Sequence, residues 1–549
     1  MPRNYNGNDK LKILFIQPTF GSIFAQHAGV PYIIGWLNRL FPYCIETEVI
    51  DMSINLVKDI LPDECEHYKS LSDISEYHIE GEKISNKINK DIGIKFNIFG
   101  STEIPETLPD IFKRAEEEKI GDQISQIQRV INDYKPDLIG ISCSFSSQVP
   151  SMFRLLFDLN VGDTPIVIGG SYVIAIMENI LTNLTDLEKC PKQYIKVLQE
   201  KDITWLKEIE SIVKYIACMF PHKIPSIISQ GIIQVDPMNL YKDVTFNCDI
   251  IPQYNSPHNY LQNKDELSIL TSRGCDWGAC SFCGTQRNRV RLGHISPYEL
   301  YKIIIKLIKK YEVNNFNFLD ETFGARYIKA CIPYFTKLEE VYNFKWEAMT
   351  RADRDMYNFL IEEKGGDVLE ASGCKMLYIG FESANEKTLQ RMNKGRVDNE
   401  KFSQILHELH RVKIFKHLYY IVGFPGETMY DMENTELFLQ EHKDVIDSLH
   451  PELFVLEKSS AIYCNPKRYD IKITGVQEFG NLCDYEPNGF IYARWEEIEK
   501  FYNEISLPNS FKNHFFGLVL LTGGFWAADY DKAQKHIKRD DYKKIFKNI

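Results

Sequence analysis

The 549-residue sequence predicts an α/β protein that contains two separate parallel sheets. Three observations predict this class. The chain is too long for a single hydrophobic core. Its composition, with 44% hydrophobic and 26% charged residues, is that of a folded protein. Two stretches alternate short apolar runs with amphipathic segments, which is the pattern of strand–helix units. We therefore expect an N-terminal doubly wound domain, then a partial (β/α) barrel, then a mainly helical C-terminal region.

The doubly wound domain is expected over residues 1–200, with a linker over 201–260. Its apolar runs are short and continuous, as in parallel strands that helices cover on both faces. An amphipathic segment at 29–42 reads as the first helix, and residues 193–216 also look helical. Open parallel sheets bind ligands beyond the carboxyl ends of their strands. The predicted strands are residues 11–18, 45–53, 137–145 and 164–172.

The barrel domain is expected over residues 261–460, where strand-like and helix-like segments alternate again. Functional residues of such barrels lie at the strand ends. Residues 461–549 lose the alternation, are rich in aromatic side chains and are expected to form a helical cap. The predicted strands are residues 266–274, 314–323, 344–352, 376–383 and 417–428, and the predicted helices are 297–311, 327–342, 399–412 and 432–446.

Charge and apolar patterning restrict the partners and the location. The net charge of −12 and the isoelectric point near 5.7 argue against nucleic acid as a general partner. No apolar run reaches the roughly 20 residues that span a membrane, and we read no signal peptide. We therefore expect a cytoplasmic protein without membrane contact. Its 13 cysteines are then not a disulfide framework.

Three cysteines are clustered in the segment TSRGCDWGACSFCG, with the spacing Cys-x4-Cys-x2-Cys. Two glycines in this segment give the backbone freedom to wrap around a metal centre. Three thiolates are one fewer than the usual four at a 4Fe-4S cluster, which leaves one iron open to a ligand. The alternative is a zinc site, for which His294 is the nearest fourth ligand. The predicted metal ligands and catalytic residues are Cys275, Cys280 and Cys283.

This loop resembles that of the radical S-adenosylmethionine (radical SAM) enzymes, whose usual motif is Cys-x3-Cys-x-aromatic-Cys. Phe282 fills the aromatic place, and the first spacing is one residue longer. The segments FLDET (318–322), MTRAD (349–353) and YIGFES (378–383) follow in the family's order. The resemblance implies that Asp320 and Glu321 contact the amino group of SAM, Arg351 its carboxylate, and Glu382 and Ser383 its ribose or amino acid.

A doubly wound domain ahead of such a barrel resembles the cobalamin-dependent radical SAM enzymes, many of which are methyltransferases. The likeness implies a Rossmann-like cobalamin-binding domain and a partial TIM-type barrel. The Asp-x-His-x-x-Gly motif that ligates cobalt in other cobalamin enzymes is missing after the first strand. A front sheet with only a structural role is therefore the alternative. The implied cobalamin contacts are Ser142, Ser144, Ser146, Gly169 and Gly170.

The expected function follows from this resemblance. SAM is cleaved at the 4Fe-4S cluster to a 5′-deoxyadenosyl radical, and cobalamin then serves to methylate an unactivated carbon of a natural product or peptide. The resemblance also implies an electron donor such as flavodoxin or ferredoxin. One alternative is a rearrangement or ring contraction with cobalamin idle or absent. Another is an iron–sulfur redox sensor or binding protein, which has no need of the SAM contacts.

Overall fold

In this computed structural model, the chain divides into two compact units with a boundary between Leu261 and Gln262, apart from two short excursions. Each unit is described by itself. The described residues are 10–19, 27–55, 108–170, 201–206, 250–257, 266–284, 294–476 and 482–487, except for single positions within these ranges, together with five isolated residues. Most of the acidic excursion at 60–130 before residue 108, the arginine-rich segment at 285–293 and the tail from 488 onward lie outside them.

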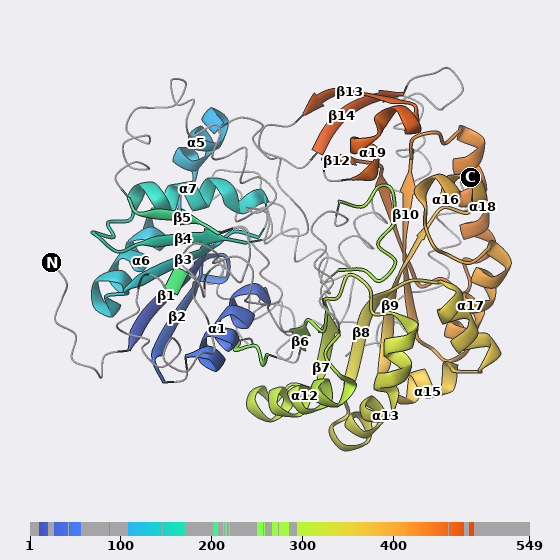
Figure 1. Cartoon of the computed structure of the whole chain (residues 1–549), viewed down its shortest axis with the longest axis horizontal. Helices are drawn as coiled ribbons and strands as arrows, with labels where there is room; N and C mark the ends of the chain where they lie inside the picture. Colours follow the sequence, from blue (N-terminus) through green and yellow to red (C-terminus); the bar gives the residue numbers. More distant parts are fainter. Residues whose placement is uncertain are drawn as a thin grey trace. The chain divides into compact units, whose positions relative to one another are not determined.

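The first unit contains a five-stranded parallel sheet with the order β2-β1-β3-β4-β5 (Figure 1). The chain passes from β1 to its two neighbours in opposite directions, so the carboxyl ends of β1 and β3 form the switch point of the sheet. This confirms the predicted parallel sheet. The strands are β1 Leu11–Gln17, β2 Ile45–Asp51, β3 Leu138–Ser142, β4 Ile166–Gly169 and β5 Ile203–Trp205.

The fifth strand corrects the sequence interpretation, because β5 lies inside the stretch 193–216 that was expected to be helical. Its neighbour β4 pairs with it in parallel from Ile166↔Ile203 to Ile168↔Trp205. Three residues are too few for a period-two pattern to appear in the sequence. The helices are α1 Gly29–Leu40, α5 Leu108–Glu117, α6 Gly121–Tyr134 and α7 Val149–Asp158.

The second unit contains a six-stranded parallel sheet with the order β11-β10-β9-β8-β7-β6, in which each strand lies beside its neighbour in the sequence (Figure 1). All five predicted strands of this region are present, and Ser448–Leu453 adds a sixth. The strands are β6 Glu266–Ile269, β7 Asn315–Phe318, β8 Lys345–Thr350, β9 Cys374–Glu382, β10 Phe415–Val422 and β11 Ser448–Leu453.

Helices pack on one face of this sheet, which we call the outer face. Phe318 of β7 packs on Phe335 of α13 at 5.6 Å between ring centroids, and Phe381 of β9 packs on Phe402 of α17 at 5.1 Å. We call the opposite face the inner face. The helices are α12 Pro297–Tyr311, α13 Ala325–Tyr342, α14 Arg354–Tyr357, α15 Gly366–Ala371, α16 Glu386–Met392, α17 Asn399–Arg411 and α18 Met429–Glu441, with a π-helical turn at Asn358–Glu362.

Local sequence signals set the ends of these helices. Ser296, Asn385 and Asp398 each accept a backbone N–H three residues ahead as the N-cap of α12, α16 and α17. Thr428 and Asp431 form a reciprocal capping box at the start of α18. These caps place the strand-to-helix connections, which carry the candidate site, in fixed positions.

The expected helical C-terminal region is wrong for its described part. Residues 471–476 and 482–487 form β13 Ile471–Val476 and β14 Leu482–Pro487, which pair in an antiparallel sheet with β12 Leu456–Glu457. The alternating burial of β13 is a period-two signal that the sequence interpretation missed. A short helix, α19 Ala461–Cys464, precedes them. Among the helices described, none has both the length and the apolar character to cross a bilayer.

Candidate functional site

The cysteine loop follows β6 and is fixed at its centre by Ser281. The Ser281 N–H donates to the carbonyl of Met392 at 2.8 Å, and its hydroxyl donates to the carbonyl of Arg391 at 3.0 Å. The Ser281 carbonyl in turn accepts from the N–H of Ile462 at 3.2 Å. Ser281 is buried, so these bonds are shielded from water. They attach the loop to the end of α16 and the start of α19.

Two aromatic residues of the loop hold it further. Phe282 packs against the hydrophobic cluster around Met392 and contacts Phe424 edge-on at 6.5 Å. The indole N–H of Trp277 donates to the carbonyl of Asn393 at 2.8 Å. A Cβ on Gly395 would lie 2.9 Å from the Trp277 ring. The segment RMNKG (391–395) therefore packs against the cysteine loop and supports it.

The three thiols lie close enough for their charges to interact. Burial raises the pKa of Cys280 to about 11, the charge of Lys394 lowers it, and the charges of Glu382, Cys283 and Cys275 raise it further. No set of three His, Cys, Asp or Glu residues within the described part of the chain is placed to hold a single metal ion. A 4Fe-4S cluster needs its thiolates farther apart than a single metal ion does, because each thiolate binds a different iron. The loop fits a cluster better than a mononuclear zinc site.

His294, the nearest fourth ligand for zinc, is occupied elsewhere. Its ring stacks on Tyr327 at 4.1 Å between centroids, and its Nδ1 lies 3.4 Å from the hydroxyl of Thr271. Burial lowers its pKa. These contacts place His294 in the packing beneath the loop and weigh against the zinc alternative.

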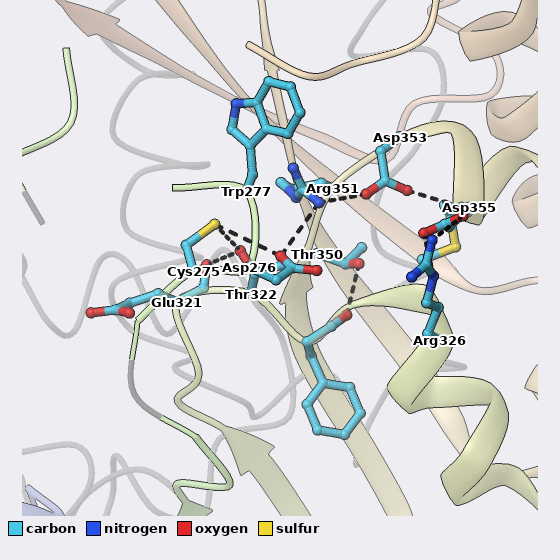
Figure 2. Close-up of polar contacts among 12 residues, drawn as sticks. Cys275, Asp276, Trp277, Glu321, Thr322, Arg326, Thr350, Arg351, Asp353 and Asp355 are labelled. Atoms are coloured by element: carbon cyan, nitrogen blue, oxygen red, sulfur yellow. Dashed lines mark hydrogen bonds and ion pairs between the residues drawn. The ribbon is translucent and has the colours of Figure 1, made fainter. Parts of the chain in front are cut away.

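The first cysteine connects the loop to the ends of β7 and β8. The Sγ of Cys275 lies 3.1 Å from the Oγ1 of Thr322, which follows β7 (Figure 2). The neighbouring Asp276 carboxylate lies 3.3 Å from Nη2 of Arg351, which follows β8. Neither Thr322 nor Asp276 was singled out from the sequence. The available signal was their place in the sequence, since Asp276 follows Cys275 in CDW and Thr322 follows Glu321 in DET.

Arg351 has unused hydrogen-bonding capacity in this position. Its Nη2 serves both Asp353, at 2.6 Å, and Asp276, and its guanidinium lies 5.5 Å from the Trp277 ring centroid. Its side chain is 11% exposed, and within the described part of the chain its buried Nε and Nη1 donate to no partner. Buried donors without a partner are costly. The carboxylate of a ligand such as SAM would supply an acceptor for one of these donors.

The two acidic residues that follow β7, Asp320 and Glu321, have different environments. The Asp320 carboxylate accepts from the Thr271 N–H at 3.0 Å, the Thr271 hydroxyl at 2.7 Å and the Ser272 hydroxyl at 2.6 Å. Its burial raises its pKa, and these hydrogen bonds counteract the rise. Asp320 therefore fixes the segment that enters the cysteine loop. Glu321 is exposed, and its carbonyl accepts the hydroxyl of Thr322, which contacts Cys275. Their predicted contacts with the SAM amino group stay predictions.

Glu382 is held in an unusual conformation at the end of β9. Its φ of +64° lies in the left-handed region, and the pairing with β10 shifts register between Tyr419 and Tyr420. The extra residue of this bulge turns the Glu382 carboxylate to Lys394, whose Nζ lies 2.6 Å away. A Cβ on Gly380 would lie 2.5 Å from that Nζ. A side chain at 380 would therefore displace the ends of the Lys394 and Glu382 side chains from this ion pair.

Ser383 and Glu427 form a buried network behind Glu382. The Ser383 hydroxyl lies 3.1 Å from the Thr435 hydroxyl and accepts from the N–H of Asn385 at 3.1 Å. The Glu427 carboxylate accepts the N–H groups of Gly423 and Phe424, each at 3.0 Å. Burial raises the pKa of Glu427 to about 8. In this structure Ser383 and Glu427 hold the ends of β9 and β10 together, and the predicted SAM contact of Ser383 stays a prediction.

At the switch point of the first sheet, Gln148 connects the ends of β1 and β3. Its side-chain N–H donates to the Pro18 carbonyl at 2.8 Å, and its side-chain oxygen accepts the Ser144 N–H at 2.8 Å. Sequence interpretation missed Gln148, because a lone glutamine before a helix carries no distinct signal. Ser142 and Ser144 are partly exposed at this edge, and the Ser146 side chain lies outside what the structure describes.

The two glycines at the end of β4 differ in whether a side chain would fit at their position. A Cβ on Gly170 would lie 2.2 Å from the Cys143 carbonyl oxygen, and its φ is +121°, so only glycine fits there. A Cβ on Gly169 would meet nothing closer than Leu206 at 3.9 Å. Gly170 thus serves close backbone packing, while Gly169 leaves the edge open toward a ligand.

Comparisons with known proteins agree with this site. The model of the radical SAM superfamily matches residues 269–439, which include the cysteine loop and the ends of β7 to β10. The chain is 26% identical over 247 residues to a bacteriochlorophyllide d C-12(1)-methyltransferase of Chlorobaculum tepidum. That match covers 43% of this chain and 49% of the relative, so the chain spans about half of the relative's length.

Two solved structures share the fold. The cobalamin-dependent S-adenosylmethionine radical enzyme OxsB with aqua-cobalamin bound has a TM-score of 0.55 at 14% identity, covering 87% of this chain and 64% of OxsB. The radical S-adenosylmethionine methyltransferase TsrM from Kitasatospora setae, with cobalamin and a 4Fe-4S cluster bound, has a TM-score of 0.54 at 11% identity, covering 96% and 99%. At these identities the likeness shows the fold.

The loop, the strand ends and the family match agree on one part of the chain: residues 269–439 are a radical SAM domain. The cofactors of that superfamily are a 4Fe-4S cluster and SAM. The cysteine spacing predicted the cluster, and the resemblance to the family predicted SAM.

Proposed function

We propose that this chain is a cobalamin-dependent radical SAM methyltransferase that methylates an unactivated carbon of a natural product or peptide. Cys275, Cys280 and Cys283 would hold the 4Fe-4S cluster, and Arg351 would bind the SAM carboxylate. When bound and reduced, the cluster supplies the electron that splits SAM into methionine and a 5′-deoxyadenosyl radical. The chain's own residues position SAM and keep water from the reacting carbon.

The observation that carries the proposal is the contact between the cysteine loop and Arg351. Asp276, the residue after the first cysteine, lies 3.3 Å from the guanidinium, whose Nε and Nη1 have no partner among the described residues. A ligand carboxylate at these donors would lie beside the loop that holds the cluster. SAM would bind next to the cluster, and an arginine beside the cysteine loop is placed to hold its carboxylate there.

Cobalamin would bind at the switch point of the first sheet, where ligands of doubly wound sheets bind. The edge there offers hydroxyls at Ser142 and Ser144 and an open backbone at Gly169. The fold likeness to OxsB and TsrM, both named with bound cobalamin, supports this assignment. The six-stranded sheet, with its sequential order and helices on one face, is inferred to be a partial (β/α) barrel whose inner face receives the substrate. We infer the domain boundaries to be 1–200, 201–260, 261–460 and 461–549.

The test is anaerobic purification and reconstitution of the full chain with iron and sulfide, with and without hydroxocobalamin. We expect a cobalamin visible spectrum only in the supplemented protein, and 5′-deoxyadenosine from SAM after reduction. Transfer of a labelled methyl group from SAM to cobalamin would support methyl transfer over a rearrangement. A cluster-replete protein that retains no cobalamin would reject the cobalamin assignment, and one that never cleaves SAM would point to the redox-sensor alternative.

A further inference from the structure

The inner face of the six-stranded sheet carries polar side chains where barrels of this kind carry bulky apolar ones. Strand register places Asn317, Glu347 and Ser268 opposite one another on this face, because their neighbours Phe316, Phe318 and Trp346 pack on the outer side. The face continues across β9, β10 and β11. Its members there are Tyr378, His417, Tyr419 and His450.

Two glutamates on the inner face are buried with carboxylate oxygens that lack hydrogen-bond partners among the described residues. Glu266, at the start of β6, is 8% exposed, and Glu347 of β8 is fully buried. Both carboxylate oxygens of Glu266 and the Oε2 of Glu347 accept no hydrogen bond in the described structure. Among the described residues, the Tyr378 hydroxyl donates to the remaining oxygen, Glu347 Oε1, at 3.2 Å. Buried carboxyl groups normally have partners.

The negative charges of the two glutamates also repel each other. Among the described residues around them, no positively charged side chain offsets this repulsion. Burial raises the pKa of Glu266, and the negative charge of Glu347 raises it further. Burial raises the pKa of Glu347 to about 8, while the bond from Tyr378 lowers it. Lys345, the nearest lysine along β8, forms its ion pair with Glu339 instead.

The other described side chains of the inner face named above are aromatic rings. None of them directs a positive charge at the two glutamates in the described part of the chain. Tyr378 and Tyr419 stack at 6.4 Å between centroids, and His417 meets Tyr419 edge-on at 4.7 Å. Burial and the charge of His450 lower the pKa of His417 well below its ordinary value, so this ring is neutral at pH 7. His450 in turn contacts Glu452 at 2.6 Å. Tyrosine faces attract cations through their π-systems.

We propose that Glu266 and Glu347 form a subsite for a positively charged nitrogen group, an ammonium or a guanidinium, of the substrate. The proposal rests on the proposed function, because it takes the inner face to be where the substrate binds. Such a group carries several N–H donors for the unpartnered carboxylate oxygens and neutralises both charges. Glu347 precedes Arg351 by four residues, or about 13 Å along an extended strand. The substrate would therefore carry its cation about that far from the SAM carboxylate.

The test measures binding of methylguanidinium to the anaerobic, cluster-replete full chain by calorimetry without reductant, with methylurea as the uncharged counterpart. We expect methylguanidinium to bind and methylurea not to bind. Glu266→Gln and Glu347→Gln should each weaken binding at least ten-fold. Glu436→Gln, which alters a buried carboxylate bonded to Tyr420 on the outer side, should leave it unchanged.

Proton release provides a second measurement. Because the pair holds protons in the absence of a cation, binding of methylguanidinium should release about one proton. Calorimetry in buffers of different ionisation enthalpy measures this release. The affinity should also rise from pH 6 to pH 9. The glutamine variants should fold with an equal or higher melting temperature, because each removes one of two buried carboxyl groups that repel each other when ionised. Equal affinity in the variants and the wild type, binding of methylurea, or no binding to the wild type would overturn the subsite. SAM cleavage, assayed separately, would show whether the proposed function fails as well.

Discussion

The Nζ of Lys394 lies 2.6 Å from the Oε1 of Glu382, and this ion pair is packed against the bare Cα of Gly380. The side chains of the pair are only 10% and 8% exposed. Lys394 also lowers the pKa of Cys280, whose burial raises it. The pair therefore sets the charge beside one of the three cluster thiols.

Removing the positive charge of Lys394 should make the cluster harder to reduce. In Lys394→Gln, the carboxylate of Glu382 remains beside Cys280 without its counter-ion. We expect the reduction potential to fall by on the order of 50 mV, since a nearby charge is worth on the order of 1 kcal/mol. A redox titration followed by electron paramagnetic resonance measures it. Lys345→Gln, which breaks a similarly shielded ion pair with Glu339, is the control and should not shift the potential.

Gly380→Ala should displace the same ion pair without removing a charge. The new Cβ would lie 2.5 Å from Lys394 Nζ and 2.6 Å from Glu382 Oε1, so both side chains have to move. We expect a folded protein whose SAM affinity falls several-fold. Gly121→Ala, whose Cβ would meet nothing within 4 Å, is the matched control. Unchanged SAM binding in Gly380→Ala would show that the position of the pair does not matter for SAM.

Arg351→Gln should weaken SAM binding by ten-fold or more, because a charge-assisted contact to a carboxylate is worth about 1.5–3 kcal/mol. Equilibrium dialysis of SAM against the reconstituted protein measures the dissociation constant. Arg326→Gln removes an arginine whose side chain is 86% exposed and paired with Asp355, and should bind SAM as the wild type does. The carboxylate assignment fails if both variants bind equally well.

Each of the variants Cys275→Ala, Cys280→Ala and Cys283→Ala should lose both the cluster absorbance and the cleavage of SAM to 5′-deoxyadenosine. Three thiolates are the minimum that hold the cluster with one iron open, so loss of any one removes it. Cys464→Ala alters an exposed cysteine outside the loop and should retain both. Cleavage by a variant that lacks the cluster would disprove the assignment.

Glu436→Gln should stabilise the protein in a pH-dependent way. Burial raises the pKa of Glu436 to about 7, and the Tyr420 hydroxyl donates to it at 2.7 Å. The folded pKa exceeds the ordinary 4.5, so ionisation of this carboxyl lowers the stability of the native state progressively between about pH 4.5 and 7. Urea unfolding should show the variant gaining about 3 kcal/mol over the wild type from pH 4.5 to pH 8. A gap that does not change with pH would contradict the assignment.

Nine of the eleven parallel strands were predicted, from short apolar or alternating runs in strand–helix units, whereas β5 and β11 were not. The errors have a physical cause in each case. β5 is three residues long, and β13 and β14 have six residues each, so their patterns were short. For the site, the cysteine spacing and the strand-end motifs named Cys275, Arg351 and Glu382 in advance. Lys394 and Gln148 were missed, because neither stands in a pattern with local meaning.

The sequence by itself indicated the class of chemistry, because three cysteines within nine residues, with glycines among them, can converge on one metal centre. It also determined the order of strands and helices, because hydrophobic periodicity is local. Only the tertiary structure decided which side chains meet. Asp276 reaches Arg351, Lys394 reaches Glu382, and Glu266 lies near Glu347 although 81 residues separate them. Such contacts depend on strand register and on a bulge in β9, which set the direction of side chains that are distant in the chain.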